Sequence, residues 1–315
     1  MGRAASFGWV LLLVLPCIEL LAHARIVGGV ASDQEWRSAA GFVRSQWQAG
    51  DLVTAAPSWA DPLLRLHLGD LMGLRMAGRS DNAAYERMWV LSVRDATAID
   101  APQRTHLQLE KRFGRVLVSR YALGKSVVLY DFVSGWRGAV ATIRSGQREE
   151  LCPLREGGFP RGGGLGKGVL YPLARRFECD ARRPWLFVAP AVMEDLSLSP
   201  RHCLWQHPQG DEPIALTFTD VPLGDELVLY GGLYYEHERM RRGGPVQADV
   251  FVDGQLRGSL IHHDGEGWKR VRIAMPAGVA RGTVRFEVHA QLPDKRSFCW
   301  EATTRRAAQA GELAP

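Results

Sequence analysis

The stretch Ile261–Trp268, which reads IHHDGEGW, is the densest group of chemically capable side chains in the C-terminal part of the sequence, residues 184–306. The Trp268 ring can stack on the apolar face of a sugar. The side chains of His262, His263 and Asp264 can hydrogen bond to the sugar hydroxyls. Because neighbouring residues on a strand point to opposite faces, the two histidines are poorly placed to hold one ion, and we expect no metal. The alternative is a hairpin turn in which Trp268 covers the core.

A second group of candidate binding residues follows the ends of two expected strands. Ser58, Trp59 and Asp61 come after the first strand, and Arg94 and Asp95 come after the second. Ligands of an open α/β sheet bind beyond the carboxyl ends of its strands, so these side chains could line one crevice. The alternative is that Asp61 caps a helix and that the Arg94–Asp95 pair forms a solvated turn.

Other motifs give little support for catalysis. The run Tyr234–Glu238, YYEHE, offers carboxylates and an imidazole that could hold Ca²⁺, although it also fits a solvated loop. The sequence contains no Gly-x-Ser-x-Gly elbow and no His-Glu-x-x-His motif. Paired carboxylates for glycoside hydrolysis cannot be selected from one sequence. We therefore assign no catalytic residue and expect no cofactor.

RIVGGV, residues 25–30, matches the start of the mature chain in trypsin-like serine proteases. Such an enzyme needs a His in an Ala-Ala-His-Cys setting, about forty residues later, to activate its nucleophile. The nearest counterpart is Thr54-Ala55-Ala56-Pro57, and no Gly-Asp-Ser-Gly-Gly string occurs to supply the nucleophile and the oxyanion hole. The motif therefore does not indicate a protease.

The N-terminus has the pattern of an export signal. Arg3 precedes an apolar run from Phe7 to Ala22 that Glu19 interrupts, and Ala22-His23-Ala24 has the small-x-small form of a signal peptidase site. The run is short for a membrane span, which needs about 20 apolar residues. We expect a signal peptide at 1–24, with an N-terminal membrane anchor through residues 7–22 as the alternative. Either places the protein in the periplasm or outside the cell.

The 315-residue chain is long enough for two domains, each with its own core. Its composition, 46% hydrophobic and 23% charged, is that of a globular protein. The formal charge of +5 is spread along the chain without a dense basic block beside aromatics, so we expect no nucleic-acid partner. The oligomeric state does not follow from the sequence.

The first domain, expected at 25–137, alternates helices with strands. Ser32-Asp33-Gln34-Glu35 forms a capping box before a helix with apolar residues at helical spacing. Asp61-Pro62 opens a second helix, and Gly114 closes a third that is expected over 102–113. Apolar runs predict strands at 52–56, 88–93, 116–121 and 126–132. This alternation predicts a Rossmann-like α/β domain with a mostly parallel sheet.

The pattern of apolar and polar residues changes in the rest of the chain. Residues 138–183 contain a run of glycines and predict a linker, because a phosphate-binding loop would need Ser or Thr where Gly168 stands. From 184 to 306, short alternating segments end in turn signals such as Asp253-Gly254, a pattern typical of an antiparallel, jelly-roll-like β-sandwich. We expect a disordered tail at 307–315. The fold class is thus a multidomain α+β protein.

Four cysteines would remain after removal of the leader: Cys152, Cys179, Cys203 and Cys299. An even number in an exported chain predicts two disulfides, and no Cys-x-x-Cys motif supports zinc. Cys203 lies just before the first alternating strand of the sandwich and Cys299 just after the last. Because the ends of such domains often meet, we favour a Cys203–Cys299 bond among three possible pairings. Elimination then pairs Cys152 with Cys179.

Part of the first domain resembles a known family. The segments Gly50-Asp51-Leu52-Val53 through Pro57-Ser58-Trp59, Gly69-Asp70 and Arg87-Met88-Trp89-Val90-Leu91 are similar to the soluble extracytoplasmic domain of bacterial polytopic glycosyltransferases of the dolichyl-phosphate mannosyltransferase type. The resemblance covers about residues 32–135 and implies an α/β appendage. This sequence lacks that family's membrane helices and the acidic residues of their first loop, so transferase activity is not implied. Residues 200–305 are similar in texture to galactose-binding-like jelly rolls and carbohydrate-binding modules.

Together these features predict a non-catalytic, exported cell-envelope protein that binds carbohydrate, in envelope glycan or glycosyl-transfer metabolism. A glycan-processing hydrolase or transferase, with its site in the α/β crevice or between the domains, is one alternative. A purely structural envelope protein is another. The sequence does not name the glycan ligand.

Overall fold

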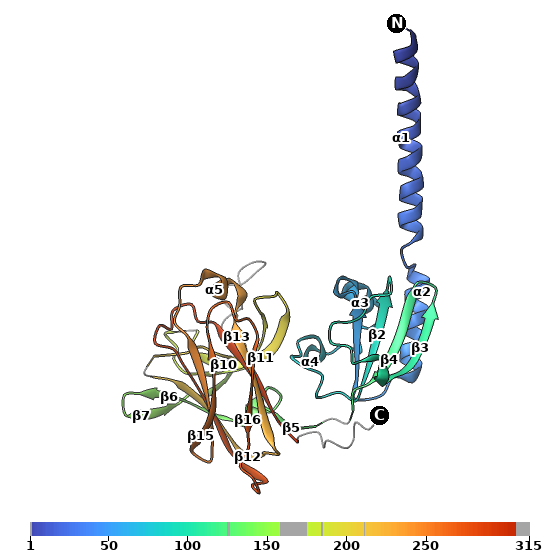
Figure 1. The fold of residues 1–315 in the computed structure, drawn as a ribbon. Coiled ribbons are helices and arrows are strands. Elements are labelled where there is room, and N and C mark those ends of the chain that lie inside the picture. The colour runs from blue at the N-terminus through green and yellow to red at the C-terminus, as the bar shows by residue number, and fades with distance from the viewer. Residues whose placement is uncertain (1, 125–126, 158–174, 184, 211, 307–315) are drawn as a thin grey trace. The chain divides into compact units, whose positions relative to one another are not determined.

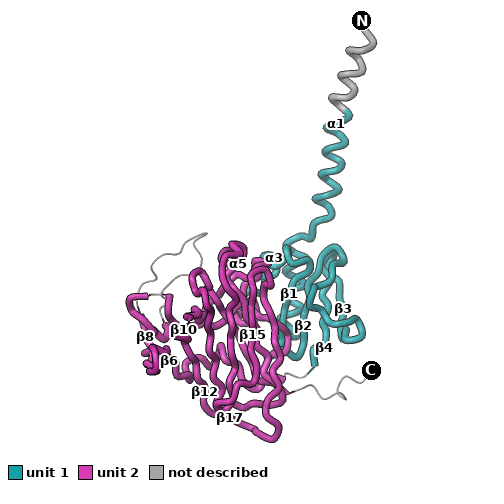
Figure 2. Tube along the Cα trace, turned by 60° about the vertical axis from the view of Figure 1, so that its left-hand side comes forward, with its two compact units in different colours: residues 1–72, 85–124, 315 teal, residues 73–84, 125–314 magenta. Residues whose placement is uncertain are grey.

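Two compact units make up the chain (Figure 2) in the computed structural model, which describes residues 2–124, 127–157, 175–183, 185–210 and 212–306. For residues 2–13 it describes the backbone alone. The first unit comprises residues 1–72 and 85–124, and the second comprises 73–84 and 125–314. The chain therefore leaves the first unit after Met72, adds residues 73–84 to the second, and returns at Tyr85.

The N-terminal helix α1 (Gly2–Gly28) is drawn in blue in Figure 1. By length and composition, one segment among the described residues could cross a membrane, and it lies here. The 27 residues of α1 rise about 40 Å at 1.5 Å each. Its large apolar side chains are exposed wherever they are described: Val14, Leu15, Ile18, Leu20, Leu21, Ile26 and Val27. Such a helix fits an export signal or a membrane anchor.

Besides α1, the first unit contains one sheet and two main helices. Its elements are α2 (Asp33–Gln46), β1 (Asp51–Ala56), η1 (Ser58–Ala60), α3 (Asp61–Leu68), β2 (Arg87–Val93), η2 (Arg104–His106), β3 (Leu107–Phe113) and β4 (Val116–Ala122). The predicted capping box is confirmed: Ser32 Oγ accepts from the Glu35 amide at 3.3 Å, and Glu35 Oε2 accepts from the Ser32 amide at 2.6 Å. The side of α2 that carries Trp36, Ala39, Ala40 and Val43 is buried.

The predicted Rossmann-like, mostly parallel sheet is wrong. The strand order is β1-β2-β4-β3, in which β1 and β2 are parallel while β4 is antiparallel to both β2 and β3. Residues 102–113, expected as a helix, contain η2 and β3. Gly114, with φ +58°, lies in a hairpin turn instead of ending a helix. A hairpin joins antiparallel neighbours, whereas each parallel pair needs a long crossover.

A buried ion pair joins β1 to β2. The Asp51 side chain is 1% exposed and accepts from Arg87 Nε and Nη2, each at 2.6 Å, and from Trp89 Nε1 at 2.9 Å. The Gln48 amide donates to the same carboxylate at 3.0 Å. Removing one partner of a buried pair costs roughly 3–5 kcal/mol. Residues that carry the glycosyltransferase resemblance thus hold the sheet together.

The second unit is the predicted β-sandwich of two antiparallel sheets (Figure 1). One sheet has the order β16-β13-β18-β11-β10-β9-β8, with β5 paired to β18, and the other has the order β15-β14-β17-β12-β6-β7. Its elements are α4 (Leu74–Ala77), β5 (Val128–Asp131), η3 (Trp136–Gly138), β6 (Val140–Ser145), β7 (Arg148–Leu151), β8 (Leu154–Glu156), β9 (Arg175–Glu178), β10 (Phe187–Glu194), β11 (Pro200–Gln206), β12 (Ile214–Pro222), β13 (Glu226–Leu233), α5 (Tyr235–Met240), β14 (Val246–Val252), β15 (Gln255–His262), β16 (Lys269–Ala274), β17 (Arg281–His289) and β18 (Phe298–Arg305).

Aromatic side chains fill the space between the two sheets. The Phe132 ring centroid lies 4.9 Å from those of both Phe218 and Phe286. Trp300 stacks on Phe286 at 4.2 Å, and its Nε1 donates to the buried Gln206 at 2.9 Å. Aromatic pairs contribute about 0.5–1.5 kcal/mol each beyond burial. This cluster is the main core of the unit.

Two stretches expected elsewhere contribute strands to the sandwich. Strand β5 falls within 126–132, which was assigned to the first domain, and it pairs with β18. The described parts of 138–183, expected as a linker, contain β6, β7, β8 and β9. Residues 158–174, which hold most of the glycine run, lie outside the described residues.

The disulfides join Cys203 to Cys299 and Cys152 to Cys179, the pairs favoured from the sequence. The Cys203–Cys299 bond lies on the face of the larger sheet that is turned away from the main core. Side chains alternate along a strand, so Leu204 faces the core while its neighbour Cys203 does not. On this outer face the bond packs in a second buried cluster with Phe187, Ala189, Ala191, Met193, Trp205 and Tyr234.

Residues 73–84, here termed the strap, belong to the second unit. Several polar contacts tie the strap to the outer face of the larger sheet, among them a hydrogen bond from Arg201 Nη1 to Arg79 O at 3.0 Å and an ion pair of Arg305 with Asp81 at 2.8 Å. The His202 amide donates to Gly78 O at 2.9 Å, and Tyr230 Oη donates to Asp81 Oδ2 at 2.8 Å. Trp268 Nε1 donates to Ser80 Oγ at 2.6 Å. The strap therefore covers a face that the sandwich core leaves open.

Candidate functional site

The stretch Ile261–Trp268 forms a loop held by buried polar groups. His262 is fully buried, and its Nε2 lies 2.7 Å from Gly267 O. The equally buried Glu238 accepts from the Gly265 and Gly267 amides at 3.1 and 2.7 Å. Burial lowers the pKa of His262, which keeps the ring neutral at pH 7. His262 therefore holds the loop and does not reach solvent.

The next two residues of this loop point different ways. The His263 side chain is 60% exposed, and its amide donates to Glu266 Oε2 at 2.8 Å. The Asp264 carboxylate is largely buried and forms an ion pair with the buried Arg296 guanidinium. Of the histidine pair, one ring thus faces inward and the other outward, so the two do not meet at one site.

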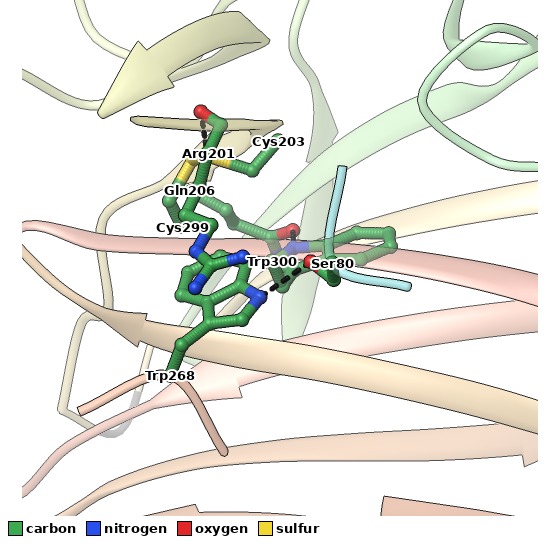
Figure 3. Close-up of a disulfide and its surroundings, with 7 residues drawn as sticks. All are labelled: Ser80, Arg201, Cys203, Gln206, Trp268, Cys299 and Trp300. Carbon is green, nitrogen blue, oxygen red and sulfur yellow. Dashed lines mark hydrogen bonds between the residues drawn. A yellow bond between two sulfur atoms is a disulfide. The ribbon is translucent and has the colours of Figure 1, made fainter. Parts of the chain in front are cut away.

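Trp268 lies on the outer face of the larger sheet (Figure 3). Its Nε1 is occupied by Ser80, and the Arg201 guanidinium carbon lies 5.6 Å from the ring centre. A Cβ at Gly232 would come within 2.8 Å of the ring, so the indole packs directly on β13. The figure shows the indole near the Cys203–Cys299 bond. The ring is partly buried and packs against the second buried cluster.

In the first unit, the structure brings Trp59 and Arg94 together. Both follow the carboxyl ends of the parallel strands β1 and β2, and the Arg94 Cζ atom lies 5.6 Å from the Trp59 ring centre. Ser58 begins η1 beside Trp59. The indole is 57% exposed, so this edge presents an aromatic ring and a cation to solvent.

The two carboxylates predicted for the same crevice pair with surface arginines. Asp61 is bound to Arg65 one helical turn away, at 2.5 Å, and Asp95 is bound to Arg112 at 2.9 Å. All four side chains are more than one third exposed. Exposed pairs of this kind contribute about 0–1 kcal/mol. The described geometry gives neither carboxylate the buried setting that a catalytic acid or base needs.

A pocket of about 470 Å³ opens in the second unit, within the range of roughly 300–1,000 Å³ that is usual for small-molecule sites. Its lining combines an indole, two imidazoles, an amide, a hydroxyl and charged groups: Arg183, Trp185, His207, Gln209, His237, Pro293, Asp294, Lys295 and Ser297. None of these residues was expected to bind a sugar, and His237 was expected only as part of the Tyr234–Glu238 run that could hold Ca²⁺. The one feature that these residues share in the sequence is a position in a segment that precedes or follows a strand.

Four segments distant in sequence form this pocket. They are the connection into β10, the residues after β11, helix α5 after β13 and the loop before β18. These four strands are neighbours in the order β13-β18-β11-β10, so their connections meet at one end of the sheet. The Tyr234 amide donates to Ser297 O at 2.9 Å, and the Ala290 amide to Gln209 O at 3.3 Å. The strand ends therefore fix the position of the pocket loops.

Both imidazoles of the pocket are held neutral. His207 is 7% exposed, and burial lowers its pKa to about 4. Its Nδ1 lies 2.8 Å from Pro208 O, which can only accept, so Nδ1 carries the proton and Nε2 keeps a lone pair. Burial is also the main cause of the lowered pKa of His237. At neutral pH the pocket thus offers imidazoles that can accept as well as donate hydrogen bonds.

Trp185 supplies the main apolar surface of the pocket. Its side chain is 40% exposed, while its carbonyl oxygen accepts from Trp205 Nε1 at 3.2 Å. Arg183 donates from Nε to Asp180 at 2.7 Å and from Nη1 to Gln209 Oε1 at 3.2 Å. These bonds fix the polar wall, and Gln209 Nε2 donates to Pro208 O at 3.1 Å.

No group of three or more His, Cys, Asp or Glu side chains is arranged to hold a metal ion in the described part of the chain. The side chains of the Tyr234–Glu238 run, which was a candidate Ca²⁺ loop, do not converge on one point. Most of it forms α5, on which successive side chains diverge by about 100°. Glu238 therefore anchors the 265–267 loop, while His237 lines the pocket and Glu236 accepts from Tyr235 Oη at 3.2 Å.

Comparisons with known proteins give no family. No family model matches the chain, and no curated protein matches it. Nothing in them bears on the glycosyltransferase resemblance.

Solved structures with weak similarity include carbohydrate-binding modules. A Clostridium perfringens ZmpB structure, containing CBM51-2 in complex with GlcNAc and INT domains, shares 12% identity over 38% of this chain and 26% of that chain, with a TM-score of 0.29. CBM51 from C. perfringens GH95, in complex with methyl-galactose, shares 9% identity over 37% of this chain and 81% of that chain, with a TM-score of 0.27. The tandem CBM51 modules of a Streptococcus pneumoniae family 98 glycoside hydrolase share 7% identity over 54% of this chain and 49% of that chain, with a TM-score of 0.29. The chain thus spans about a quarter of the first of these, and TM-scores this low carry no inference to a shared ligand.

Proposed function

We propose that this protein binds a carbohydrate in the pocket at the end of its β-sandwich. The observation that carries the proposal is the half-exposed Trp185 ring beside a fixed set of neutral and charged hydrogen-bonding groups. Sugars present an apolar ring face and a rim of hydroxyls. An indole next to convergent polar groups matches both features.

The protonation states of the pocket suit hydroxyl groups. A sugar hydroxyl donates and accepts at once, and a neutral imidazole does the same. His207, with its pKa of about 4, keeps an Nε2 lone pair throughout the neutral range. Gln209 and Ser297 add an amide and a hydroxyl to the lining. The pocket therefore favours a neutral, hydroxyl-rich ligand of one or two sugar rings.

We also propose that the protein acts outside the cytosol, in or near the cell envelope. Two disulfides in the described chain and an exposed apolar helix at the N-terminus support this location. Polysaccharides are abundant ligands there. We assign this protein a binding role and no catalytic residue.

A glycan array on the purified full chain in detergent tests the sugar-binding proposal. We expect Trp185→Ala to weaken binding to any hit by about tenfold or more, because loss of an aromatic contact and its burial removes 1.4 kcal/mol or more. Trp59→Ala is the matched control, since it removes an exposed indole from the first unit and should leave affinity unchanged. Absence of binding by the unaltered chain, or equal loss in both variants, would contradict the pocket assignment. Turnover of a bound glycan would show an enzyme instead.

A further inference from the structure

An apolar stripe lies exposed at one edge of the first unit. Trp59, Leu63 and Leu66 follow one another at spacings of four and three residues along η1 and α3, so they share one helical face. Their exposed fractions are 57%, 39% and 71%. Arg94 adds a cation beside Trp59, 5.6 Å from the ring centre. These four residues are here termed the edge patch.

The edge patch lies where the chain arrives from α1. Arg94 follows the last residue of β2, Val93, which pairs with Val116 just after the β3–β4 turn. The amide of Arg115 in that turn donates to Glu35 Oε1 at 3.1 Å, and Glu35 belongs to the cap that begins α2. The start of α2 and the end of β2 are therefore at the same edge of the sheet.

Helix α3 lies along α2, and Arg44 Nη2 in the last turn of α2 donates to His67 O at 2.6 Å. Nε2 of His67, in the last turn of α3, lies 3.2 Å from Asp33 Oδ1 at the first residue of α2, close although not aligned as a hydrogen bond. The α2 cap, Ser32, comes four residues after the end of α1 at Gly28. Four residues span at most about 14 Å. A membrane that holds α1 would therefore lie close to the edge patch.

The helix itself extends beyond the expected cleavage position. Helix α1 continues past Ala24 to Gly28, and Ile26 and Val27, 65% and 54% exposed, lengthen its apolar surface. A helix of about 40 Å is longer than the roughly 30 Å hydrocarbon core of a bilayer. An apolar helix of this length fits a retained anchor.

We propose that α1 stays in the membrane and that the edge patch docks on the lipid surface beside it. Indole rings concentrate at the membrane interface because their apolar body and their N–H group suit its two sides. Arg94 has no carboxylate partner among the described residues, so its guanidinium can bind a lipid phosphate, while leucine side chains enter the acyl region. The inference uses the envelope location proposed above but not the sugar pocket.

Site-directed spin labelling of the full chain in nanodiscs of phosphatidylethanolamine and phosphatidylglycerol tests this docking. In a Cys17→Ser background the other four cysteines are in disulfides, so a nitroxide attaches only to an introduced cysteine. Leu66→Cys places the label in the edge patch. Leu256→Cys, 56% exposed on β15 of the second unit, is the matched control.

We expect the label at position 66 to favour collisions with oxygen over a water-soluble nickel chelate several-fold more than the label at 256. Adding Trp59→Ser and Leu63→Ser should move position 66 toward the control value. Equal accessibility at both positions would overturn the proposal, as would loss of the chain from the discs through cleavage of α1. A label shielded from both reagents would show a protein contact and would also overturn it. None of these outcomes touches sugar binding, which the array measures separately.

Discussion

Glu301 of β18 is a carboxyl group in a largely buried position on the outer face of the larger sheet. Burial raises its pKa to about 7, and the nearby Asp81 adds to the effect. Ser80 and Arg201 act in the opposite direction, through a hydrogen bond and a positive charge. The balance leaves Glu301 close to half protonated at neutral pH, which makes the stability of this face sensitive to pH.

The sign of that dependence follows from the direction of the shift. Between pH 4.5, the ordinary pKa, and about 7, the folded chain holds the Glu301 proton while the unfolded chain does not. The free energy of unfolding therefore falls as pH rises through this window. We expect Glu301→Gln to raise the free energy of unfolding by roughly 1–3 kcal/mol at pH 8, with little effect at pH 4.5. Urea denaturation at the two pH values measures the difference.

Glu149 provides the control for this substitution. A hydrogen bond from Arg285 is the main cause of its lowered pKa, so any stability it contributes is present at neutral pH and is lost on acidification. Glu149→Gln should therefore give no gain at pH 8. A similar gain in both variants would mean that removal of negative charge, and not burial of Glu301, explains the result.

At the scale of elements, the strap depends on a close backbone approach. A Cβ at Gly78 would lie 2.6 Å from His202 N and 2.9 Å from His202 Cβ. We expect Gly78→Ala to push the strap off β11 and to lower the free energy of unfolding by about 1–3 kcal/mol, a usual cost of overpacking. Faster hydrogen exchange over 73–84 and tryptic cleavage at Arg79 would report the displacement.

Gly73 begins the same strap and gives a matched comparison. A Cβ there would meet nothing within 4 Å, so Gly73→Ala should leave exchange and cleavage unchanged. If the two alanine variants behaved alike, glycine flexibility rather than the contact with β11 would govern the strap.

At the scale of the whole molecule, the disulfides close loops of different length. Cys203 and Cys299 are 96 residues apart, and Cys152 and Cys179 are 27 apart. In the chain-entropy account, the longer loop gives the larger stabilisation, about 4–5 kcal/mol against about 3–4. We expect paired serine substitutions to lower the thermal midpoint in that order, with Cys17→Ser as the neutral control. The reverse order in calorimetry would show that local packing outweighs loop entropy.

Features that depend on neighbouring residues could be predicted from the amino-acid sequence. The capping box at Ser32 needs a hydroxyl and a carboxylate three residues apart, and the alternation of Ile214, Leu216 and Phe218 needs one strand with one buried face. The cysteine pairing followed from strand order along the chain. Each of these signals lies within one short segment or, for the cysteines, at the two ends of the sandwich domain.

Features that depend on residues distant in sequence could not be predicted without the three-dimensional fold. Strand direction in the first sheet depends on whether residues 102–113 form a strand that pairs with β4 or a helix that connects two parallel strands. A short apolar run that ends in a glycine is compatible with both structures. Trp185, His207 and His237 meet because the start of β10 and the ends of β11 and β13 lie at one end of the sheet, and a position just outside a strand does not by itself mark a pocket. His262 and Trp268 have the chemistry of a binding site but are engaged by Glu238, Gly267 and the strap. Residue type sets what a side chain can do, and burial and neighbours set what it does, because hydrogen-bonding capacity is used up by whichever partner the fold brings within reach.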